Sequence, residues 1–303
     1  MKLIDAASVR RALAFKPLAA ALETMWVTGC EQPPRHVHQV GRDLTMLIMP
    51  AWQAGRYLGV KLININAAAR GMPGLFASYN LFDAQTGVPL ATIDGTELTA
   101  RRTAAVSALA ASKLARPDAR RLLVLGAGRV ACLLPQAYQA LFPALDEVMV
   151  WARRPEQALA LAERLMDEGL NARAVPGLAS AIQQADIVCS ATAATEPLVR
   201  GEWLAPGSHL DLLGSFTPAM READSACFGG GASVWVDSEE ALAKSGDLVV
   251  PLKDGVITGV SGTLADLCRD GPGRSNAQQR TVFKAVGTAL ADLAAAVLVY
   301  ESS

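Results

Sequence analysis

Residues 120–131 read Arg-Arg-Leu-Leu-Val-Leu-Gly-Ala-Gly-Arg-Val-Ala, and this stretch decides the fold. Its short apolar run at 122–125 predicts a strand that is buried on both faces of a parallel sheet. A helix-prone run to about Phe142 follows the glycines, and a second apolar strand occupies residues 147–151. Strand, glycine turn, helix and strand in this order predict a βαβ unit.

The pattern Gly126-x-Gly128-x-x-Ala131 lies at the first crossover of this unit. Gly126 permits the tight turn, Gly128 lets the backbone approach a pyrophosphate, and Ala131 lets the helix pack closely on the strand. Free backbone N–H groups at the positive end of the helix would then bind the phosphates. We therefore expect a dinucleotide site. The alternative is a glycine-rich turn in an α/β domain that binds nothing.

The end of the second strand indicates which dinucleotide binds. An acid there would hydrogen-bond the adenosine ribose and favour NAD, but Trp151 and Ala152 are followed by Arg153 and Arg154. A guanidinium pairs well with a phosphate dianion, and Trp151 or an arginine can stack on adenine. We expect NADP(H) to be preferred and NAD(H) to be possible. The alternative is that the arginines lie in a solvated loop.

The composition is that of an ordinary globular protein. The chain has 303 residues, enough for two domains, with 51% hydrophobic and 19% charged residues and a formal net charge of -1. This balance gives no support for nucleic-acid binding, and no apolar run approaches the length of a membrane span. The first residues lack the layout of a signal peptide. The five cysteines form no Cys-x-x-Cys pair, so we expect no metal site and reduced thiols in a cytoplasmic protein.

The first region of the chain reads as strands without crossover helices. Helices are expected over 5–28, strands at 44–51 and 59–66, a hairpin at 78–94 and a long helix at 95–114. After Arg120 strands and helices alternate, which predicts a doubly wound parallel sheet. A final helix, about Gln278 to Tyr300, is expected to return to the first region.

We therefore expect an α/β protein with two domains. Residues 118–280 form the dinucleotide-binding domain, and residues 1–117 with about 281–303 form a second α+β domain. Ligands bind at the carboxyl ends of the strands in a doubly wound sheet, which places 190–195 and 214–217 in the cofactor crevice. The expected cofactor contacts are Gly126, Ala127, Gly128, Arg129, Val130, Trp151, Arg153, Arg154, Ser190, Ala191, Thr192, Leu213 and Gly214.

Three cations of the first region stand among apolar or helical neighbours: Arg35, Lys61 and Arg102. Buried cations are unfavourable unless they are paired. Three cations in one cleft would bind a substrate carboxylate, although each one taken singly is more often a surface group.

Several motifs agree in order and spacing with one known family. They are Met49-Pro50-Ala51, Gly59-Val60-Lys61, Thr86-Gly87-x-Pro89-Leu90-Ala91, the run 98–105 (Leu-Thr-Ala-Arg-Arg-Thr-Ala-Ala), Gly126-x-Gly128, and the late run 281–287 with Asp292-Leu293-Ala294. On these motifs the chain resembles the ornithine cyclodeaminase/mu-crystallin family over almost its whole length. The resemblance implies a Rossmann domain, a second domain built from both chain ends, a homodimer formed through that second domain, and a small imino or amino acid substrate.

In that family the residues that match Lys61 and Arg102 lie against the substrate. The resemblance therefore implies catalytic roles for both, with Arg35 as a third substrate contact. We also assign Thr103, which follows Arg102 on the same helix, to the cofactor.

One position departs from the deaminating members of the family. They carry an Asp in a stretch like Gly-x-Asp-x-Pro, whereas this chain has Phe216 at that place, in Gly-Ser-Phe-Thr-Pro at 214–218. Phenylalanine cannot move a proton. Imine reductases can dispense with the Asp, because their substrate already contains C=N.

The run 211–222 resembles members that reduce Δ1-pyrroline-2-carboxylate and Δ1-piperideine-2-carboxylate. We therefore expect NADPH-dependent formation of L-proline and L-pipecolate, with Phe216 as an apolar substrate contact.

Two other functions stay open. An ornithine cyclodeaminase or an alanine dehydrogenase would need a relocated base, for which Asp211 or Asp83 would have to serve. A binding protein of mu-crystallin type would hold NADP and a small ligand without catalysis. The chain retains Lys61, Arg102 and the glycine turn, which argues against the loss of catalytic activity.

Overall fold

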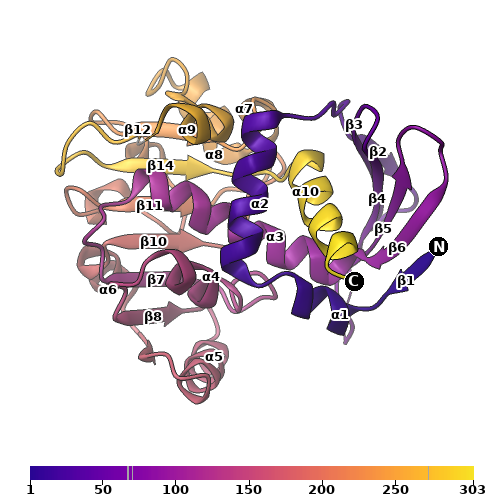
Figure 1. Cartoon of the computed structure of the whole chain (residues 1–303). Helices are drawn as coiled ribbons and strands as arrows, with labels where there is room; N and C mark the ends of the chain where they lie inside the picture. Colours follow the sequence, from indigo (N-terminus) through magenta and orange to yellow (C-terminus); the bar gives the residue numbers. More distant parts are fainter. Residues whose placement is uncertain (67, 70, 272) are drawn as a thin grey trace. The chain divides into compact units, whose positions relative to one another are not determined.

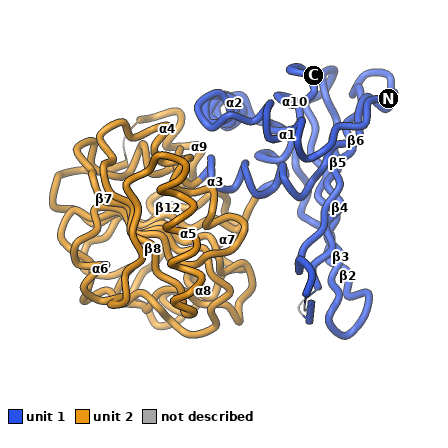
Figure 2. The backbone as a smooth tube through the Cα atoms, turned by 90° about the horizontal axis from the view of Figure 1, so that it is seen from below, with its two compact units in different colours: residues 1–106, 288–303 blue, residues 107–287 orange. Residues whose placement is uncertain are grey.

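The computed structural model of the chain describes residues 1–66, 68–69, 71–271 and 273–303. The chain divides into two compact units (Figure 2), one of residues 1–106 with 288–303 and one of residues 107–287. These boundaries differ from those expected at 117 and about 281. The first lies inside helix α3 (Gly95–Leu114), and the second follows strand β14 (Thr281–Lys284), which pairs within the sheet of the second unit.

A six-stranded sheet forms the frame of the first unit (Figure 1), in the order β1-β6-β5-β4-β3-β2. Strand β1 is parallel to β6, and the other pairs are antiparallel. The strands are β1 (Lys2–Ile4), β2 (His36–Gln39), β3 (Leu44–Gln53), β4 (Tyr57–Asn66), β5 (Leu75–Asp83) and β6 (Pro89–Asp94). The helices are α1 (Ala6–Ala12), α2 (Phe15–Thr28), the first part of α3, and α10 (Ala289–Glu301).

Strand β4 illustrates how this sheet distributes its side chains. Gly59, Lys61 and Ile63 are buried, whereas Leu62 is 36% exposed. This alternation follows from the two-residue period of a strand. Helix α10 packs against β3, β4 and β5, and nearly all of its residues up to Ala296 are buried and apolar. One face of the sheet is therefore covered by a helix from the far end of the chain.

An eight-stranded parallel sheet forms the second unit, in the order β13-β12-β14-β11-β10-β7-β8-β9. Besides β14, the strands are β7 (Arg121–Leu125), β8 (Glu147–Trp151), β9 (Ala172–Ala174), β10 (Ile187–Ser190), β11 (His209–Leu212), β12 (Ser233–Val236) and β13 (Gly262–Thr263). The helices are α4 (Leu134–Leu141), α5 (Pro155–Asp167), α6 (Leu178–Gln184), α7 (Ala241–Lys244), α8 (Gly246–Lys253) and α9 (Leu264–Asp270), with short 3-10 helices η1 (Gly201–Trp203) and η2 (Ser225–Cys227). The predicted doubly wound Rossmann sheet is confirmed.

The strand order of this sheet reverses between β7 and β10. Strand β7 continues outward through β8, and β10 continues in the other direction through β11. Ser190 pairs with Leu125 on one side and with Leu212 on the other, so the three strands end at the same level. Ligands of such sheets bind where the order reverses. A ligand site in this unit is therefore expected in the loops after β7, β10 and β11.

The helix after the glycine turn begins later than expected. Residues 129–133 form turns, and regular helix α4 starts at Leu134. Pro135 explains this start, because proline lacks an N–H group and is favoured in the first turn of a helix.

The final helix also begins later than its predicted start near Gln278. Residues 281–284 form strand β14, and Gly287 then adopts a φ of 80° before Thr288 caps α10. In the part of the chain that the structure describes, no helix is long and apolar enough to cross a membrane.

Candidate active site

Lys61 and Arg102 share one carboxylate, that of Asp292. The Nζ atom of Lys61 lies 2.6 Å from Oδ2 of Asp292, and the Nε atom of Arg102 lies 2.8 Å from Oδ1. The residues come from β4, α3 and α10, and Lys61 is 1%, Arg102 5% and Asp292 0% exposed. A buried cation requires such a partner. The shared carboxylate of Asp292 therefore explains how Lys61 and Arg102 can both be buried beside the apolar helix α10.

Asp292 lies in the first turn of α10, where its neighbours up to Ala296 are apolar. The N–H of Ala291 donates to the hydroxyl of Thr288, and the N–H of Leu290 donates to the side-chain oxygen of Gln32. These two caps set the start of the helix and hence the position of the carboxylate. The sequence motifs include Asp292, but we did not assign it to the site. An acid within the apolar run 289–296 at the start of this helix is the signal that identifies it.

Burial lowers the pKa of Lys61 to about 8. The carboxylate of Asp292 opposes this effect, and the positive charges of Arg102 and Arg35 strengthen it. Arg35 is half-buried, so the three expected cations do gather within the first unit. Lys61 and Arg102 share the single carboxylate of Asp292, so this trio carries a net positive charge, which favours an anionic ligand. A lysine that titrates near pH 8 can also give up and take back a proton.

Tyr79 lies opposite Lys61 on strand β5. Its hydroxyl occupies the space that a side chain at Gly59 would fill. Burial raises the pKa of Tyr79 well above its ordinary value, and the negative charge of Asp292 adds to this. The phenol is therefore neutral and leaves the charge balance around Lys61 unchanged.

The glycine turn after β7 has the geometry that a phosphate site needs. Gly126 adopts a φ of 110°, and a Cβ atom there would lie 2.8 Å from the carbonyl oxygen of Ala191. A Cβ atom at Gly128 would meet nothing within 4 Å. Within the described ranges, the backbone N–H groups of Ala127, Gly128 and Val130 have no internal acceptor. The donors suited to a pyrophosphate thus belong to the turn itself, and not to the first turn of α4 as expected.

The polar groups at the ends of β10 and β11 form hydrogen bonds within the second unit. The hydroxyls of Ser190 and Thr192 donate to Glu222, and so does the backbone N–H of Gly214. Ser190 is completely buried, whereas Ala191 and Leu213 are half-buried. Glu222 is a residue of this edge that we did not assign from the sequence.

Two cations and an aromatic ring mark the end of β8. Arg153 and Arg154 are exposed, and Arg154 directly precedes helix α5. Trp151 is half-buried and lines a groove of about 280 Å³ together with Pro155 and Val175. The edge therefore offers an apolar surface beside two guanidinium groups.

Thr103 and Arg129, two further expected cofactor contacts, differ in their surroundings. The hydroxyl of Thr103 donates to the carbonyl oxygen of Thr99 within α3, at 2.7 Å. Arg129 is exposed on the glycine turn.

Phe216 stands in the loop after β11 and is 41% exposed. The two acids considered as relocated bases are both engaged elsewhere. Asp211 is completely buried and accepts hydrogen bonds from Tyr138 and Ser107, and its burial raises its pKa to about 6. Asp83 accepts hydrogen bonds from the N–H groups of residues 85 and 86, which closes the turn between β5 and β6.

The comparisons with known proteins agree with one another. A family model described as the ornithine cyclodeaminase/mu-crystallin family matches residues 5–303. A Δ1-pyrroline-2-carboxylate reductase of Paracoccus denitrificans (strain Pd 1222) is 44% identical over 255 residues, which cover 82% of this chain and 80% of that protein.

Two solved structures are similar over nearly the whole chain. One is Thermococcus litoralis Δ1-pyrroline-2-carboxylate reductase in complex with NADH and L-proline, with a TM-score of 0.94 and 30% identity, covering 99% of this chain and 97% of that one. The other is an archaeal alanine dehydrogenase dimer with bound NAD, with a TM-score of 0.92 and 26% identity, covering 99% of this chain and 95% of that one.

Proposed function

The chain belongs to the ornithine cyclodeaminase/mu-crystallin family, and from this premise we propose that it reduces cyclic imine carboxylates with NADPH. The proposed substrates are Δ1-pyrroline-2-carboxylate and Δ1-piperideine-2-carboxylate, and the products are L-proline and L-pipecolate. Relatives named as Δ1-pyrroline-2-carboxylate reductases support this substrate class. The observation that carries the proposal is that Lys61 and Arg102 both pair with the same buried carboxylate, that of Asp292.

Arg102 is proposed to bind the substrate carboxylate. Among the described contacts it uses Nε on Asp292, and the other N–H groups of its guanidinium fork suit a carboxylate in bidentate geometry. Arg35 adds a second positive charge close to Lys61. A carboxylate bound by two cations aligns the imine for reaction.

Lys61 is proposed to move a proton at Nζ. Its ammonium group is held by Asp292 and has a pKa of about 8, so it can donate a proton to the imine nitrogen under mild conditions. A protonated C=N group accepts a hydride far better than a neutral one. The burial of Lys61 and Asp292 also keeps bulk water from competing for that proton.

The second unit is proposed to hold the dinucleotide, which supplies the hydride when bound. The turn at Gly126 and Gly128 fits a pyrophosphate, because it is open and has free backbone donors. Arg153 and Arg154 support a preference for NADPH, since a guanidinium pairs with the 2′-phosphate. The similar structures named above contain NADH or NAD, so NADH is a possible second cofactor.

Phe216 favours imine reduction over deamination. It stands where deaminating members of the family carry an Asp, and a phenyl ring cannot act as a base. Asp211 and Asp83 are poor substitutes, because one is buried with Tyr138 and the other closes a turn. We propose that the ring of Phe216, which is 41% exposed, contacts the apolar methylenes of the substrate.

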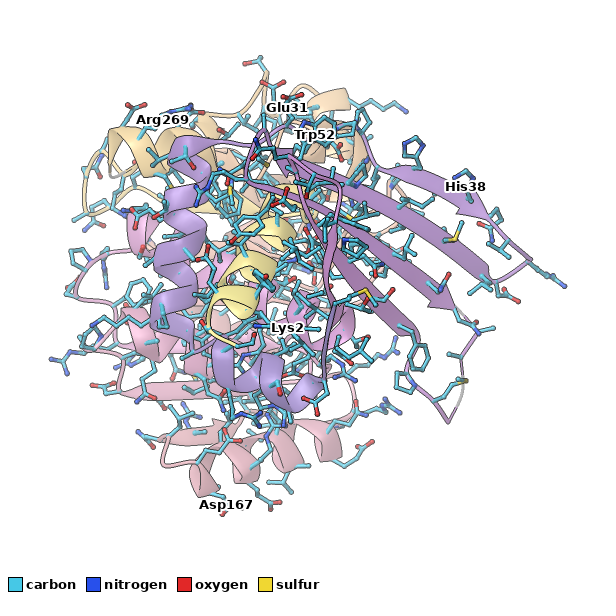
Figure 3. The ribbon with its side chains drawn as sticks, turned by 45° about the vertical axis from the view of Figure 1, so that its right-hand side comes forward. Lys2, Glu31, His38, Trp52, Asp167 and Arg269 are labelled. Carbon is cyan, nitrogen blue, oxygen red and sulfur yellow. The ribbon has the colours of Figure 1, made fainter. Side chains whose placement is uncertain are left out.

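We propose that the chain acts as a homodimer through its open sheet face, defined here as Ile48, Val60, Leu62 and Phe76. Leu62 pairs with Ile48 across β3 and β4 and is 36% exposed, and Phe76 is 49% exposed. Figure 3 shows the sheet with His38 labelled on its edge strand β2. Exposed apolar side chains gathered on one face are typical of a protein interface. The similar alanine dehydrogenase is a dimer, which supports this proposal.

We also propose that the protein acts in the cytoplasm.

One experiment separates this function from its alternatives. Purified protein is mixed with NADPH and, in turn, with Δ1-pyrroline-2-carboxylate, Δ1-piperideine-2-carboxylate or pyruvate plus ammonia, and NADPH oxidation is followed at its absorbance. A parallel sample contains ornithine and NAD. We expect turnover with the cyclic imines alone. Turnover with ornithine would establish a cyclodeaminase, and tight NADPH binding without turnover would establish a binding protein of mu-crystallin type.

A further inference from the structure

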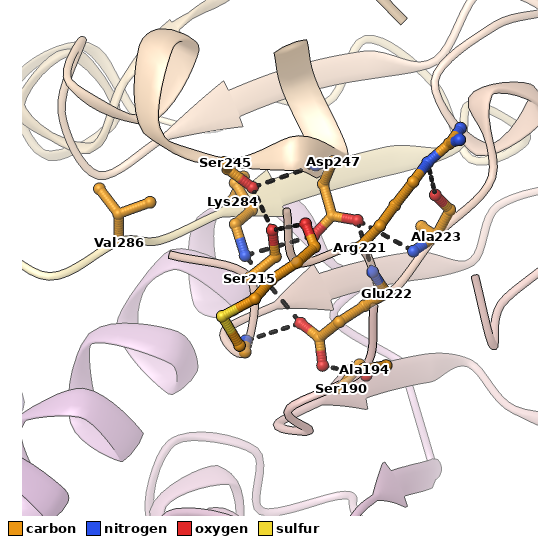
Figure 4. A network of polar contacts seen from close by, with 12 residues as sticks. Ser190, Ala194, Ser215, Arg221, Glu222, Ala223, Ser245, Asp247, Lys284 and Val286 are labelled. Carbon is orange, nitrogen blue, oxygen red and sulfur yellow. Dashed lines mark hydrogen bonds and ion pairs between the residues drawn. The ribbon is translucent and has the colours of Figure 1, made fainter. Parts of the chain in front are cut away.

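Glu222 is the centre of a buried polar network in the second unit (Figure 4). Its Oε1 atom accepts hydrogen bonds from the hydroxyl of Ser190 at 2.6 Å and from the N–H and the hydroxyl of Thr192, both at 2.8 Å. Its Oε2 atom accepts a hydrogen bond from the N–H of Gly214 at 2.6 Å. One side chain therefore joins the loop after β10 to the loop after β11.

The backbone of Glu222 is fixed as firmly as its carboxylate. The Oδ1 atom of Asp247 accepts hydrogen bonds from the N–H groups of Glu222, at 2.7 Å, and Ala223, at 3.0 Å. The Nζ atom of Lys284 lies 3.4 Å from Asp247 and 4.0 Å from Glu222, and it brings a positive charge to the two acids. All three charged side chains are completely buried. Both carboxylate oxygens and the backbone N–H of Glu222 are hydrogen-bonded, whereas the Nζ atom of Lys284 and the Oδ2 atom of Asp247 make no hydrogen bond among the described residues. The satisfied, and therefore rigid, part of the network is the part centred on Glu222.

The loop after β10 is packed between Glu222 and the glycine turn. A Cβ atom at Gly214 would collide with the carbonyl oxygen of Thr192, and one at Gly126 would lie 2.8 Å from the carbonyl oxygen of Ala191. Both glycines are therefore in direct contact with this loop. A displacement of residues 190–192 away from Glu222 would press on the glycine turn or open a gap beside it.

We propose that Glu222 is a positioning residue of the dinucleotide site, which holds residues 190–192 and 213–214 against the glycine turn in the conformation that binds the dinucleotide. This inference rests on the proposed function, because it takes the turn at Gly126 and Gly128 as the phosphate site. Glu222 itself is 0% exposed. It acts through the backbone of the loops that it fastens, and not by contact with the cofactor.

A carboxylate is required at this position because every group facing it is a donor. An ionised carboxylate only accepts hydrogen bonds, whereas a glutamine amide presents an NH₂ group on one side. In Glu222→Gln, that NH₂ group would face either the N–H of Gly214 or the donors of Ser190 and Thr192. One of the two loops would then lose its hydrogen bonds to residue 222, although the side chain keeps its size.

The experiment is a direct binding titration that needs no turnover. NADPH and NADH are titrated into native protein and into Glu222→Gln, and the change in nucleotide fluorescence gives Kd for each. We expect Kd in Glu222→Gln to rise at least tenfold, the range for loss of a hydrogen bond to a buried charge. A Kd within twofold of native would overturn the proposal. If the native protein itself binds no dinucleotide, the proposed function fails first, and the inference about Glu222 fails with it.

Asp224→Asn is the matched control. Asp224 is a neighbouring acid of the same unit that also accepts backbone hydrogen bonds, from Gly201 at 3.0 Å and Cys227 at 3.2 Å, but it fastens η1 and η2 and not the loops at the cofactor edge. We expect Asp224→Asn to lower the melting temperature and leave Kd unchanged. An equal rise of Kd in both variants would mean that any weakening of the unit impairs binding, which would overturn a specific role for Glu222.

A milder pair of variants covers the case in which Glu222→Gln fails to fold. Ser190→Ala and Thr192→Val each remove one hydroxyl donor and leave the carboxylate in place. We expect each to raise Kd for the dinucleotide several-fold, and the double variant to raise it further. Native affinity in the double variant would overturn the proposal.

Discussion

The Nζ atom of Lys61 and the Oδ2 atom of Asp292 lie 2.6 Å apart, and neither side chain is more than 1% exposed. The two residues are far apart in the sequence and come from a central strand and from the last helix. Burial lowers the proton affinity of the lysine, and the carboxylate opposes this. The result is an amine with a pKa of about 8 in a region of excess positive charge. Such an amine is suited to hold a proton for an anionic substrate and then to release it.

The rate of imine reduction should depend on pH through Lys61. The ammonium form predominates below pH 8 and is lost as the pH rises through about 8, so kcat/KM for imine reduction should fall over that range. Oxidation of the amino acid needs the free amine and should rise over the same range. Asp292→Asn should move both transitions to lower pH, because the carboxylate favours the charged lysine. A profile without a transition between about pH 6 and 10 would exclude Lys61 as the proton donor.

Lys61→Ala and Arg102→Ala should each abolish most turnover while the protein stays folded. Each removes one cation from the shared carboxylate of Asp292 and leaves the other in place. We expect kcat/KM to fall by roughly a hundredfold or more, in line with the loss of a positioned acid–base or carboxylate-binding group. Circular dichroism checks the fold, and Lys16→Ala, at an exposed position of α2, is the control. Near-native activity in either variant would show that the substrate carboxylate binds elsewhere.

The fold of the second unit could be predicted because its signals are local. The apolar run at 122–125 and the glycine spacing each describe a few consecutive residues, and the structure contains the strand and the open turn that they predict. The sequence predicts a helix directly after the glycines, whereas α4 begins at Leu134. Pro135 favours a helix start at this position over one among the helix-prone residues before it.

The partners within the site could not be predicted, because they depend on tertiary contacts. Arg102 and Asp292 are 190 positions apart, and nothing in either segment indicates the other. Ser190 was expected at the cofactor crevice as a strand-end residue, but its hydroxyl is directed to Glu222, which lies 32 positions later. The sequence therefore identified the edge of the sheet, whereas the direction of each side chain at that edge follows from packing.

Changing Arg153 and Arg154 together to Ala should weaken NADPH selectively. Both are exposed at the end of β8 and replace the acid that would favour NAD. We expect a loss of about 2 kcal/mol in NADPH binding, which is typical of hydrogen bonds to a charged group. The affinity for NADH serves as the internal control and should change little. Equal affinities of the native protein for NADPH and NADH would contradict the assignment.

Leu62→Lys should dissociate the proposed homodimer. Leu62 is an outward-facing residue of β4, 36% exposed, between buried Lys61 and Ile63. A lysine at this position would place a charge in the centre of an apolar interface. Sedimentation equilibrium should give a dimer for the native protein and a monomer for the variant. Val88→Lys is the control, because Val88 is exposed at 53% and lies outside the four residues of the open sheet face. A native protein that sediments as a monomer would refute the interface.

Phe216 should determine which reactions the protein performs. Because it replaces a proton-transferring Asp, the native chain should be inert toward ornithine and toward alanine with NAD or NADP, yet should reduce the cyclic imines with NADPH. If its ring covers the methylenes of the substrate, Phe216→Ala should raise KM for the imine more than it lowers kcat, since the lost burial is worth about 0.8 kcal/mol for each CH₂ group. Phe216→Asp should lose affinity for the imine, because it places a second carboxylate near the substrate's own. Steady-state kinetics with both imines measure these effects, and measurable ornithine cyclisation by the native protein would transfer the role of base to another residue.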